Sequence, residues 1–257
     1  MYHKRKFALA LSLIAILALT ACGGDGGSDA PFAPAATAEG AYGGTLSGST
    51  SDTFSLLVLE DGEYWTLYGT QFSGVMYVAG FIQGTGTSSN GTFTSSNGRD
   101  FGFTPAIPAT VNATYNAATP SIAGTVTEAA GTVNFSGGAM PGSLYNYNTP
   151  ASLPAVVGAW TLTTLSGERL ALNVSASGAF SAAASSGCNF SGTVSPRPSG
   201  KNVFNVALRF GLAPCALAGQ TATGIAVTYP LATGGNELTI AAIDGTRNYG
   251  EAAFGVR

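Results

Sequence analysis

The stretch GAWTLTTLSGERLALNVSASGAF, residues 158–180, decides the fold class of this chain. Within it, Leu170, Leu172 and Val174 alternate with small or polar residues, and this two-residue period is typical of a β-strand with one face toward a core. Gly178 then marks a turn before the next run begins. The stretch therefore predicts short antiparallel strands joined by tight hairpins.

The same pattern occurs earlier in the chain, in residues 40–64, GAYGGTLSGSTSDTFSLLVLEDGEY. The matching segments are Gly40-Ala41-Tyr42 with Gly158-Ala159-Trp160, Leu46-Ser47-Gly48 with Leu165-Ser166-Gly167, and Phe54, Leu56 and Val58 with Leu170, Leu172 and Val174. Asp61-Gly62 is a tight hairpin signal. We infer two copies of one β unit, with chance similarity between strands rich in Gly, Ser and Thr as the alternative.

Short runs rich in Val, Thr, Phe, Tyr and Leu continue through both halves and are interrupted at regular intervals by turn residues, as in a β-meander. From residue 39 onward we find no helical periodicity. In the first half we expect strands at 40–48, 53–60, 63–70, 74–84, 90–96, 109–117, 120–127 and 131–137. In the second half we expect them at 156–165, 168–176, 178–185, 188–196, 201–210, 221–230, 236–243 and 246–255.

Eight antiparallel strands leave exposed edges unless the sheet closes, and an up-and-down barrel removes those edges. We therefore predict an all-β protein with two tandem small antiparallel meander β-barrels of about eight strands each; a pair of β-sandwiches is the alternative. The predicted domain limits are a signal peptide at 1–21, a flexible tether at 22–38, a first barrel at 39–138, a linker at 139–155 and a second barrel at 156–257. Each barrel is long enough to contain a core of its own.

The N-terminal segment has the three parts of a secretory signal. Residues 4–6 are basic, residues 7–19 are apolar except for one serine, and small residues precede Cys22. The segment Leu19-Thr20-Ala21-Cys22 resembles the lipobox of bacterial lipoprotein signals, which implies that Cys22 is the site of lipid attachment and that the protein contacts a membrane through that anchor. Gly23 after it implies the outer membrane by the same resemblance. A plain signal peptide followed by a buried or disulfide-bonded Cys22 is the alternative.

Composition excludes several classes of function. The single histidine, His3, lies in the predicted signal peptide, so the exported chain would contain no general base or metal ligand of that type. Removing residues 1–21 removes three of the 10 basic residues, which leaves 7 against 13 acidic residues, a net charge of −6. That balance argues against nucleic-acid binding. We expect a non-enzymatic protein without a cofactor or a metal.

Two further cysteines, Cys188 and Cys215, lie in the second half. In an exported protein an isolated pair most often forms a disulfide. A catalytic redox pair is typically a Cys-x-x-Cys motif, which the chain lacks. We predict a structural disulfide.

With its lipobox, Gly-rich tether and tandem β units, the chain resembles a group of uncharacterised outer-membrane lipoproteins of Gram-negative bacteria. The segment GCNFSGTV at 187–194, together with Cys215, looks like a signature shared with that group. More distantly, the ending GEAAFGV at 250–256 is similar to the last barrel strand of transferrin-binding surface lipoproteins. Neither resemblance implies an enzymatic activity.

Of three functions, the sequence favours the first, a non-enzymatic binding module at the outer membrane. It would present barrel-end loops to a protein or glycan partner, and its candidate contacts are Tyr64, Trp65, Tyr68, Arg99 and Asp100. Aromatic residues of this kind more often pack on a barrel face, and a charged pair of this kind is more often a solvated turn. The second function is a lipocalin-like carrier of a small apolar ligand, for which the small side chains of residues 179–184 favour the second barrel. The third is a structural envelope protein.

Overall fold

The computed structural model describes residues 36–73, 75–231 and 234–257. Almost all of the regular structure in these ranges is β-strand, and the one helical element among them is the short 3₁₀ helix η1 (Leu153–Ala155). The predicted signal peptide, Cys22 and residues 22–35 of the predicted tether lie outside the described residues, so these predictions remain untested.

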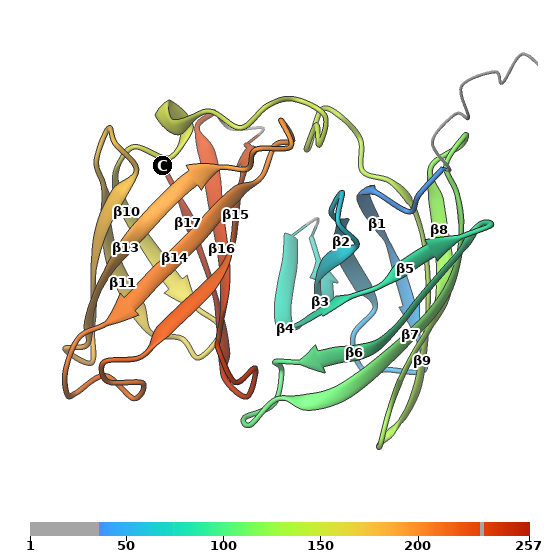
Figure 1. Cartoon of the computed structure of the whole chain (residues 1–257), viewed down its shortest axis with the longest axis horizontal. Coiled ribbons are helices and arrows are strands. Elements are labelled where there is room, and N and C mark those ends of the chain that lie inside the picture. The colour runs from blue at the N-terminus through green and yellow to red at the C-terminus, as the bar shows by residue number, and fades with distance from the viewer. Residues whose placement is uncertain (1–35, 74, 232–233) are drawn as a thin grey trace, which may run out of the picture. The chain divides into compact units, whose positions relative to one another are not determined.

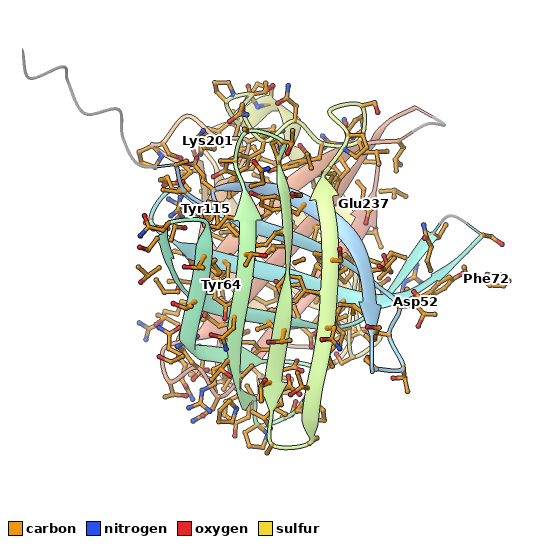
Figure 2. The ribbon with its side chains drawn as sticks, turned by 90° about the vertical axis from the view of Figure 1, so that its right-hand side faces the viewer. Asp52, Tyr64, Phe72, Tyr115, Lys201 and Glu237 are labelled. Carbon is orange, nitrogen blue, oxygen red and sulfur yellow. A yellow bond between two sulfur atoms is a disulfide. The ribbon has the colours of Figure 1, made fainter. Side chains whose placement is uncertain are left out.

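The first barrel is a meander that closes on itself (Figure 1). Its strands are β1 (Gly40–Ser47), β2 (Thr53–Val58), β3 (Glu63–Phe72), β4 (Val75–Thr85), β5 (Thr87–Ser89), β6 (Thr92–Asp100), β7 (Ile107–Asn116), β8 (Ser121–Glu128) and β9 (Gly131–Ala139). Strand β9 returns to pair with β1, and β4 pairs with β6 through Ile82↔Asp100 and Gln83↔Arg99. The short β5 pairs only with β6, so eight strands form the wall. Figure 2 shows this barrel from the side, with Phe72 at the outer end of β3.

The second barrel is closed in the same way. Its strands are β10 (Gly158–Thr164), β11 (Arg169–Val174), β12 (Ala179–Ala184), β13 (Asn189–Pro196), β14 (Phe204–Phe210), β15 (Thr221–Pro230), β16 (Asn236–Asp244) and β17 (Gly250–Val256). Strand β17 pairs with β10 through Thr163↔Phe254 and Thr164↔Ala253. The predicted fold class, two tandem closed eight-strand antiparallel barrels, is confirmed, and the β-sandwich alternative is wrong because neither sheet is left open.

Strand alternation decides which side chains fill each barrel. Phe54, Leu56 and Val58 share one face of β2 and pack inside the first barrel against aromatic residues from the opposite wall. Two edge-to-face aromatic pairs lie within this core, Phe54 with Phe135 and Tyr64 with Phe93. Aromatic side chains therefore fill most of the first barrel.

A second apolar cluster lies on the outer faces of the barrel walls and includes residues of both halves. Trp65 and Phe81 of the first barrel stack with their ring centroids 6.0 Å apart. Residues of β15, β16 and β17 belong to the same cluster, among them Ile225, Val227 and Ile243. The repeat pattern did not predict this outer core.

Next to this cluster, Arg197 forms ion pairs with the acidic turn that follows β2. Its guanidinium forms ion pairs with Glu60 at 2.7 Å, Asp61 at 2.6 Å and Glu63 at 3.5 Å. The carboxylates of this turn are thus bound to a side chain from the other half of the chain.

Candidate functional site

The interior of the second barrel holds a cavity of about 780 Å³. This volume falls within the range of about 300–1,000 Å³ that is usual for small-molecule sites. Its wall is mainly apolar, and inward side chains of all eight strands contribute to it. The apolar lining residues that the strands contribute are Leu162, Leu170, Leu172, Phe180, Ala182, Ala184, Phe190, Val206, Leu208, Phe210, Ala222, Ile240, Ala242 and Ala253.

Small inward residues leave this space open. On β12, alternation turns Phe180, Ala182 and Ala184 toward the interior, while the residues between them are exposed. Two of the three inward positions on this strand are therefore alanines. In the first barrel, large aromatic side chains occupy the interior, and the cavity there measures about 270 Å³. The structure thus places the larger cavity in the barrel that the run 179–184 predicts.

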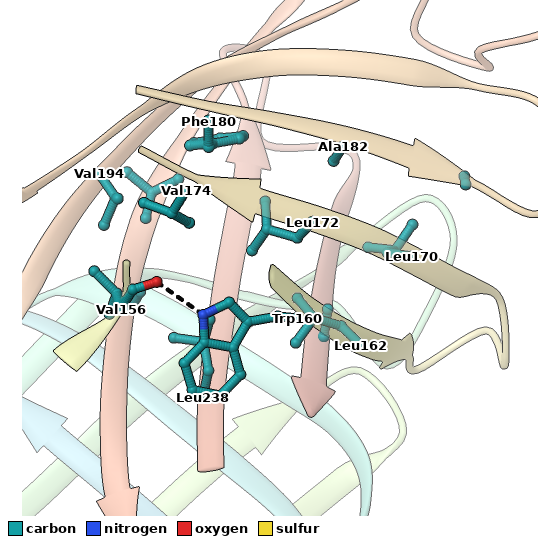
Figure 3. Close-up of a cluster of buried hydrophobic side chains, with 14 of the residues drawn as sticks. Val156, Trp160, Leu162, Leu170, Leu172, Val174, Phe180, Ala182, Val194 and Leu238 are labelled. Atoms are coloured by element: carbon teal, nitrogen blue, oxygen red, sulfur yellow. Dashed lines mark hydrogen bonds between the residues drawn. The ribbon is translucent and has the colours of Figure 1, made fainter. Parts of the chain in front are cut away.

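Large side chains close one end of the second barrel (Figure 3). Trp160 lies at the centre of this end, where its indole Nε1 donates a hydrogen bond to the carbonyl oxygen of Val156 at 2.8 Å. The guanidinium carbon of Arg257 lies 4.1 Å from the centroid of the indole ring. None of Val156, Trp160, Val174, Val194, Phe204 and Leu238 lines the cavity, although all belong to the same core. These side chains form the floor of the cavity.

The connections at the other end surround the mouth. The turn between β12 and β13 is tied to the loop between β14 and β15 by the disulfide Cys188–Cys215, whose Cα atoms lie 4.5 Å apart. The predicted disulfide is thereby confirmed. Pro214 and Leu217 of the same loop line the mouth. The disulfide therefore holds two parts of the rim together.

The mouth is polar and acidic. Glu168, Asp244 and Glu251 line it together with Thr164 and Gln220, and no Lys or Arg is among the lining residues that the structure describes. Burial raises the pKa of Glu251, although its carboxylate accepts hydrogen bonds from the Leu165 amide at 2.9 Å and the Ser166 hydroxyl at 3.1 Å. The site thus combines an apolar interior with a rim of hydrogen-bond acceptors and negative charge.

The candidate contacts from the sequence lie in three places. Tyr64 is 2% exposed inside the first barrel, where its hydroxyl donates to Ser95 Oγ at 3.1 Å. Trp65 is 6% exposed and belongs to the outer apolar cluster. Arg99 lies beside the β6–β7 loop, with its guanidinium 3.5 Å from the carbonyl oxygen of Ala106. These three side chains do not form one site.

Tyr68 and Asp100, however, are brought together. The Tyr68 hydroxyl donates to Asp100 Oδ1 at 2.7 Å, and the Gly102 amide donates to the same oxygen at 2.7 Å. Both side chains line the smaller cavity of the first barrel, as does Glu128. The pKa of Glu128 is raised to about 7, mainly by burial and to a lesser extent by the hydrogen bond with Asp100 and the charge of Asp100.

Glu128 makes the stability of the protein depend on pH. Its carboxyl keeps a proton up to about pH 7 in the folded chain but has an ordinary pKa of 4.5 when exposed. Between these two values the unfolded chain binds fewer protons than the folded chain. The free energy of unfolding therefore falls as the pH rises through this window, and Glu128 causes no further fall above it. Burial raises the pKa of Glu237 and Glu251 as well, which adds to the same trend.

We therefore expect Glu128→Gln to make unfolding less dependent on pH. Urea denaturation at pH 5 and pH 8 should show the original chain losing stability toward pH 8, and the variant, which cannot ionise at this position, losing less. An equal loss in both proteins would contradict the assignment of the buried proton to Glu128.

The described residues contain no group of three or more His, Cys, Asp and Glu side chains that could hold a metal ion. Within those residues, no helix has the length and apolar character needed to cross a membrane.

The sequence did not point to the acidic rim of the second cavity or to Glu128. These carboxylates are isolated in sequence and flanked by ordinary turn residues, so no local motif marks them. Their grouping follows from barrel closure, which brings Glu168 after β10 beside Glu251 of β17. In an eight-strand meander, every second connection lies at the same end of the barrel. This rule predicts that the connections carrying the rim carboxylates share one end, and it could have located the rim from the sequence.

Comparisons with known proteins add little to this geometry. No protein-family model matches the chain, and no curated protein matches it. Among solved structures, a protein of unknown function from the DUF3598 family of Nostoc punctiforme is similar, with 9% sequence identity and a TM-score of 0.24, over 85% of this chain and 94% of that chain. At this score the similarity carries no argument about function, and nothing in these comparisons supports the resemblance to transferrin-binding lipoproteins.

Proposed function

We propose that this protein is a non-enzymatic carrier that holds one small apolar molecule inside the second barrel. The observation that carries the proposal is the cavity of about 780 Å³, which has an apolar wall, a floor of packed side chains and a single rim of polar groups. A barrel needed only for structural support would be filled by its own side chains, as the first barrel largely is.

The rim defines the chemistry of the ligand's polar end. Glu168, Asp244 and Glu251 supply acceptors and negative charge, and no described lining residue supplies a positive charge. A carboxylate or phosphate head group would be repelled there, whereas an alcohol or an ammonium group would donate hydrogen bonds. The preferred ligand is an apolar chain or ring system with a neutral or cationic donor at one end.

A titration with matched probes tests this proposal. Two fluorescent alkyl probes of equal chain length, one ending in an amine and the other in a carboxylate, are added to the purified protein. The amine probe should bind with a stoichiometry of one per chain and more tightly than the carboxylate probe. Absence of saturable binding by either probe would contradict the carrier function, and tighter binding of the carboxylate would contradict the proposed head-group chemistry.

We further propose that the carrier is attached to the outer membrane by acyl chains on Cys22. The support is the lipobox-like segment Leu19-Thr20-Ala21-Cys22 and its preceding basic and apolar regions. Two or three acyl chains hold a protein on a bilayer, whereas one chain gives only reversible binding.

Cys22→Ser should therefore prevent lipid attachment. Metabolic labelling with palmitate should label the original chain and not the variant, because the acyl chains have no other proposed attachment site. Equal labelling of both proteins would contradict the anchor, while the cavity and its ligand would be unaffected by that outcome.

The binding-module alternative lacks a comparable observation. Its candidate contacts Tyr64 and Trp65 are buried, and Tyr68 and Asp100 bond to each other inside the first barrel. A macromolecular partner would not reach Tyr64, Tyr68 or Asp100 without opening the barrel, and Trp65 is covered by the outer apolar cluster. We therefore favour a small molecule as the ligand.

A further inference from the structure

The hairpin of β3 and β4 extends beyond the wall of the first barrel. Strand β2 pairs with β3 only as far as Thr53↔Gly69, and β4 meets β6 only at Ile82 and Gln83. Residues 70–72 and 75–77 therefore pair only with each other, from Thr70↔Tyr77 to Phe72↔Val75. Figure 2 shows Phe72 at the end of this ribbon, away from the barrel wall.

This hairpin exposes large apolar side chains. Phe72 is 69% exposed, Val75 57% and Tyr77 61%. Phe72 is paired with Val75, and Thr70, two residues before Phe72, is paired with Tyr77, so the three apolar side chains share one face of the ribbon. We call Phe72, Val75 and Tyr77 the hairpin patch.

No charge surrounds the patch in sequence. The chain contains no Asp, Glu, Lys or Arg between Glu63 and Arg99. Among the described residues, the charged side chain that contacts the hairpin is Asp52, whose carboxylate accepts a hydrogen bond from the Gln71 amide at 2.9 Å. The outer end of the hairpin can therefore leave water without burying an ionised group.

The hairpin patch lies on the same face of β3 as residues that point into the first barrel. Alternation along β3 places Tyr68, Thr70 and Phe72 on one face. Tyr68 lines the smaller cavity, and so does Ala79 of β4. This face of the hairpin thus leads from the cavity wall to the exposed end, with Thr70 between the two aromatic residues and a register shift between Tyr68 and Gly69.

We propose that the hairpin patch inserts into the interfacial region of a lipid bilayer. Three side chains on a two-stranded ribbon are far smaller than the roughly 800 Å² per partner that a stable protein interface needs. Exposed aromatic rings, in contrast, partition well into the boundary between lipid head groups and acyl chains. The described chain begins at the barrel end opposite the hairpin, where the Tyr115 hydroxyl donates a hydrogen bond to the Ala36 carbonyl oxygen. Residues 23–35 can span up to about 45 Å, so an anchor on Cys22 is long enough to allow either end of the first barrel to meet the membrane.

This inference shares the proposed anchor with the carrier function but does not depend on the cavity of the second barrel. The patch has no basic residue, and the exported chain has an acidic balance. Binding should therefore occur on neutral bilayers, should not increase with anionic lipid, and should be insensitive to salt.

The test uses residues 23–257, a chain without Cys22 that retains every strand of both barrels. Flotation with phosphatidylcholine vesicles, and with vesicles containing added phosphatidylglycerol, measures partitioning. Because Cys188 and Cys215 are paired, a cysteine introduced by Ser73→Cys can be labelled alone with an environment-sensitive dye. Thr119→Cys, in the turn between β7 and β8 at the opposite end of the barrel, is the matched control.

The chain should float with both kinds of vesicle, and the dye at residue 73 should shift to the blue while the dye at residue 119 does not. Phe72→Ser combined with Tyr77→Ser should weaken partitioning at least about tenfold, with an unchanged circular dichroism spectrum and unchanged binding of the amine probe. Failure of the original chain to float, equal shifts at both dye positions, or patch-dependent dimers without vesicle binding would overturn the inference. Loss of probe binding with retained flotation would contradict only the carrier function.

Discussion

Replacing Ala182 with tryptophan should abolish ligand binding by the second barrel. Ala182 is buried on β12 and lines the middle of the cavity, where its neighbours across the sheet are Leu172 and Phe190. An indole at this position would occupy the volume that a ligand needs. We expect the affinity for the amine probe to fall at least about 100-fold, which corresponds to about 2.8 kcal/mol of binding free energy.

Ala183→Trp is the matched control. Ala183 is the next residue of the same strand, but its side chain is exposed on the outer face of the barrel. This variant adds the same group at the same height and should leave the affinity unchanged. Equal affinities in the two variants would place the ligand outside the barrel, provided that both keep the circular dichroism spectrum of the original chain.

Loss of the disulfide should have the largest effect on stability. Cys188 and Cys215 are 27 residues apart in sequence, and their bond closes the chain across the rim of the cavity. On the chain-entropy model, a loop of this length stabilises the folded state by about 3–4 kcal/mol. Replacing both cysteines with alanine should lower the free energy of unfolding by that amount, measured by urea denaturation under oxidising conditions.

The same double variant separates stability from binding. At low urea the barrel remains closed by the β10–β17 pairs, so the amine probe should still bind. Addition of a reductant to the original chain should reproduce the loss of stability and have no effect on the variant. An unchanged free energy of unfolding in the variant would show that the bond only joins segments already fixed by packing.

Local pattern predicts most of the fold because each strand is short and has one buried face. The alternation of Leu170, Leu172 and Val174 predicts the inward face of β11, and the glycines between runs predict the hairpins. Barrel closure follows from the cost of two exposed edges. The ends of strands are less well predicted: β6 extends to Asp100, beyond the predicted limit of 96, because its far end pairs with β4 as the barrel closes.

The outer apolar cluster could not be predicted in the same way. Trp65 and Phe81 lie on outward positions, which in an isolated barrel face water. Their burial depends on residues of β15 and β16, more than 140 positions away in sequence, and on Arg197 meeting the acidic turn at Glu60. Nothing in the local alternation specifies contacts between two outer faces.

The candidate site was predictable in its interior and not at its rim. The run of small residues at 179–184 indicates an unfilled barrel, because alternation makes every second residue point inward. The pairing of Tyr68 with Asp100 joins two residues that the sequence marks for separate reasons, and it arises only because β4 and β6 close the first barrel. Contacts between side chains that meet when the barrel closes can be predicted only once the register of the strands is known.

The most direct test of a carrier function is mass spectrometry of the protein purified from the cells that produce it. Native spectra of the gently purified chain should show one bound apolar molecule per protein, carrying an alcohol or an amine and no acidic head group. The Ala182→Trp variant, purified in parallel, should carry none, and the Ala183→Trp variant should carry the same molecule as the original chain. An original chain that is free of any bound molecule, and that also fails to take up the amine probe, would contradict the carrier function.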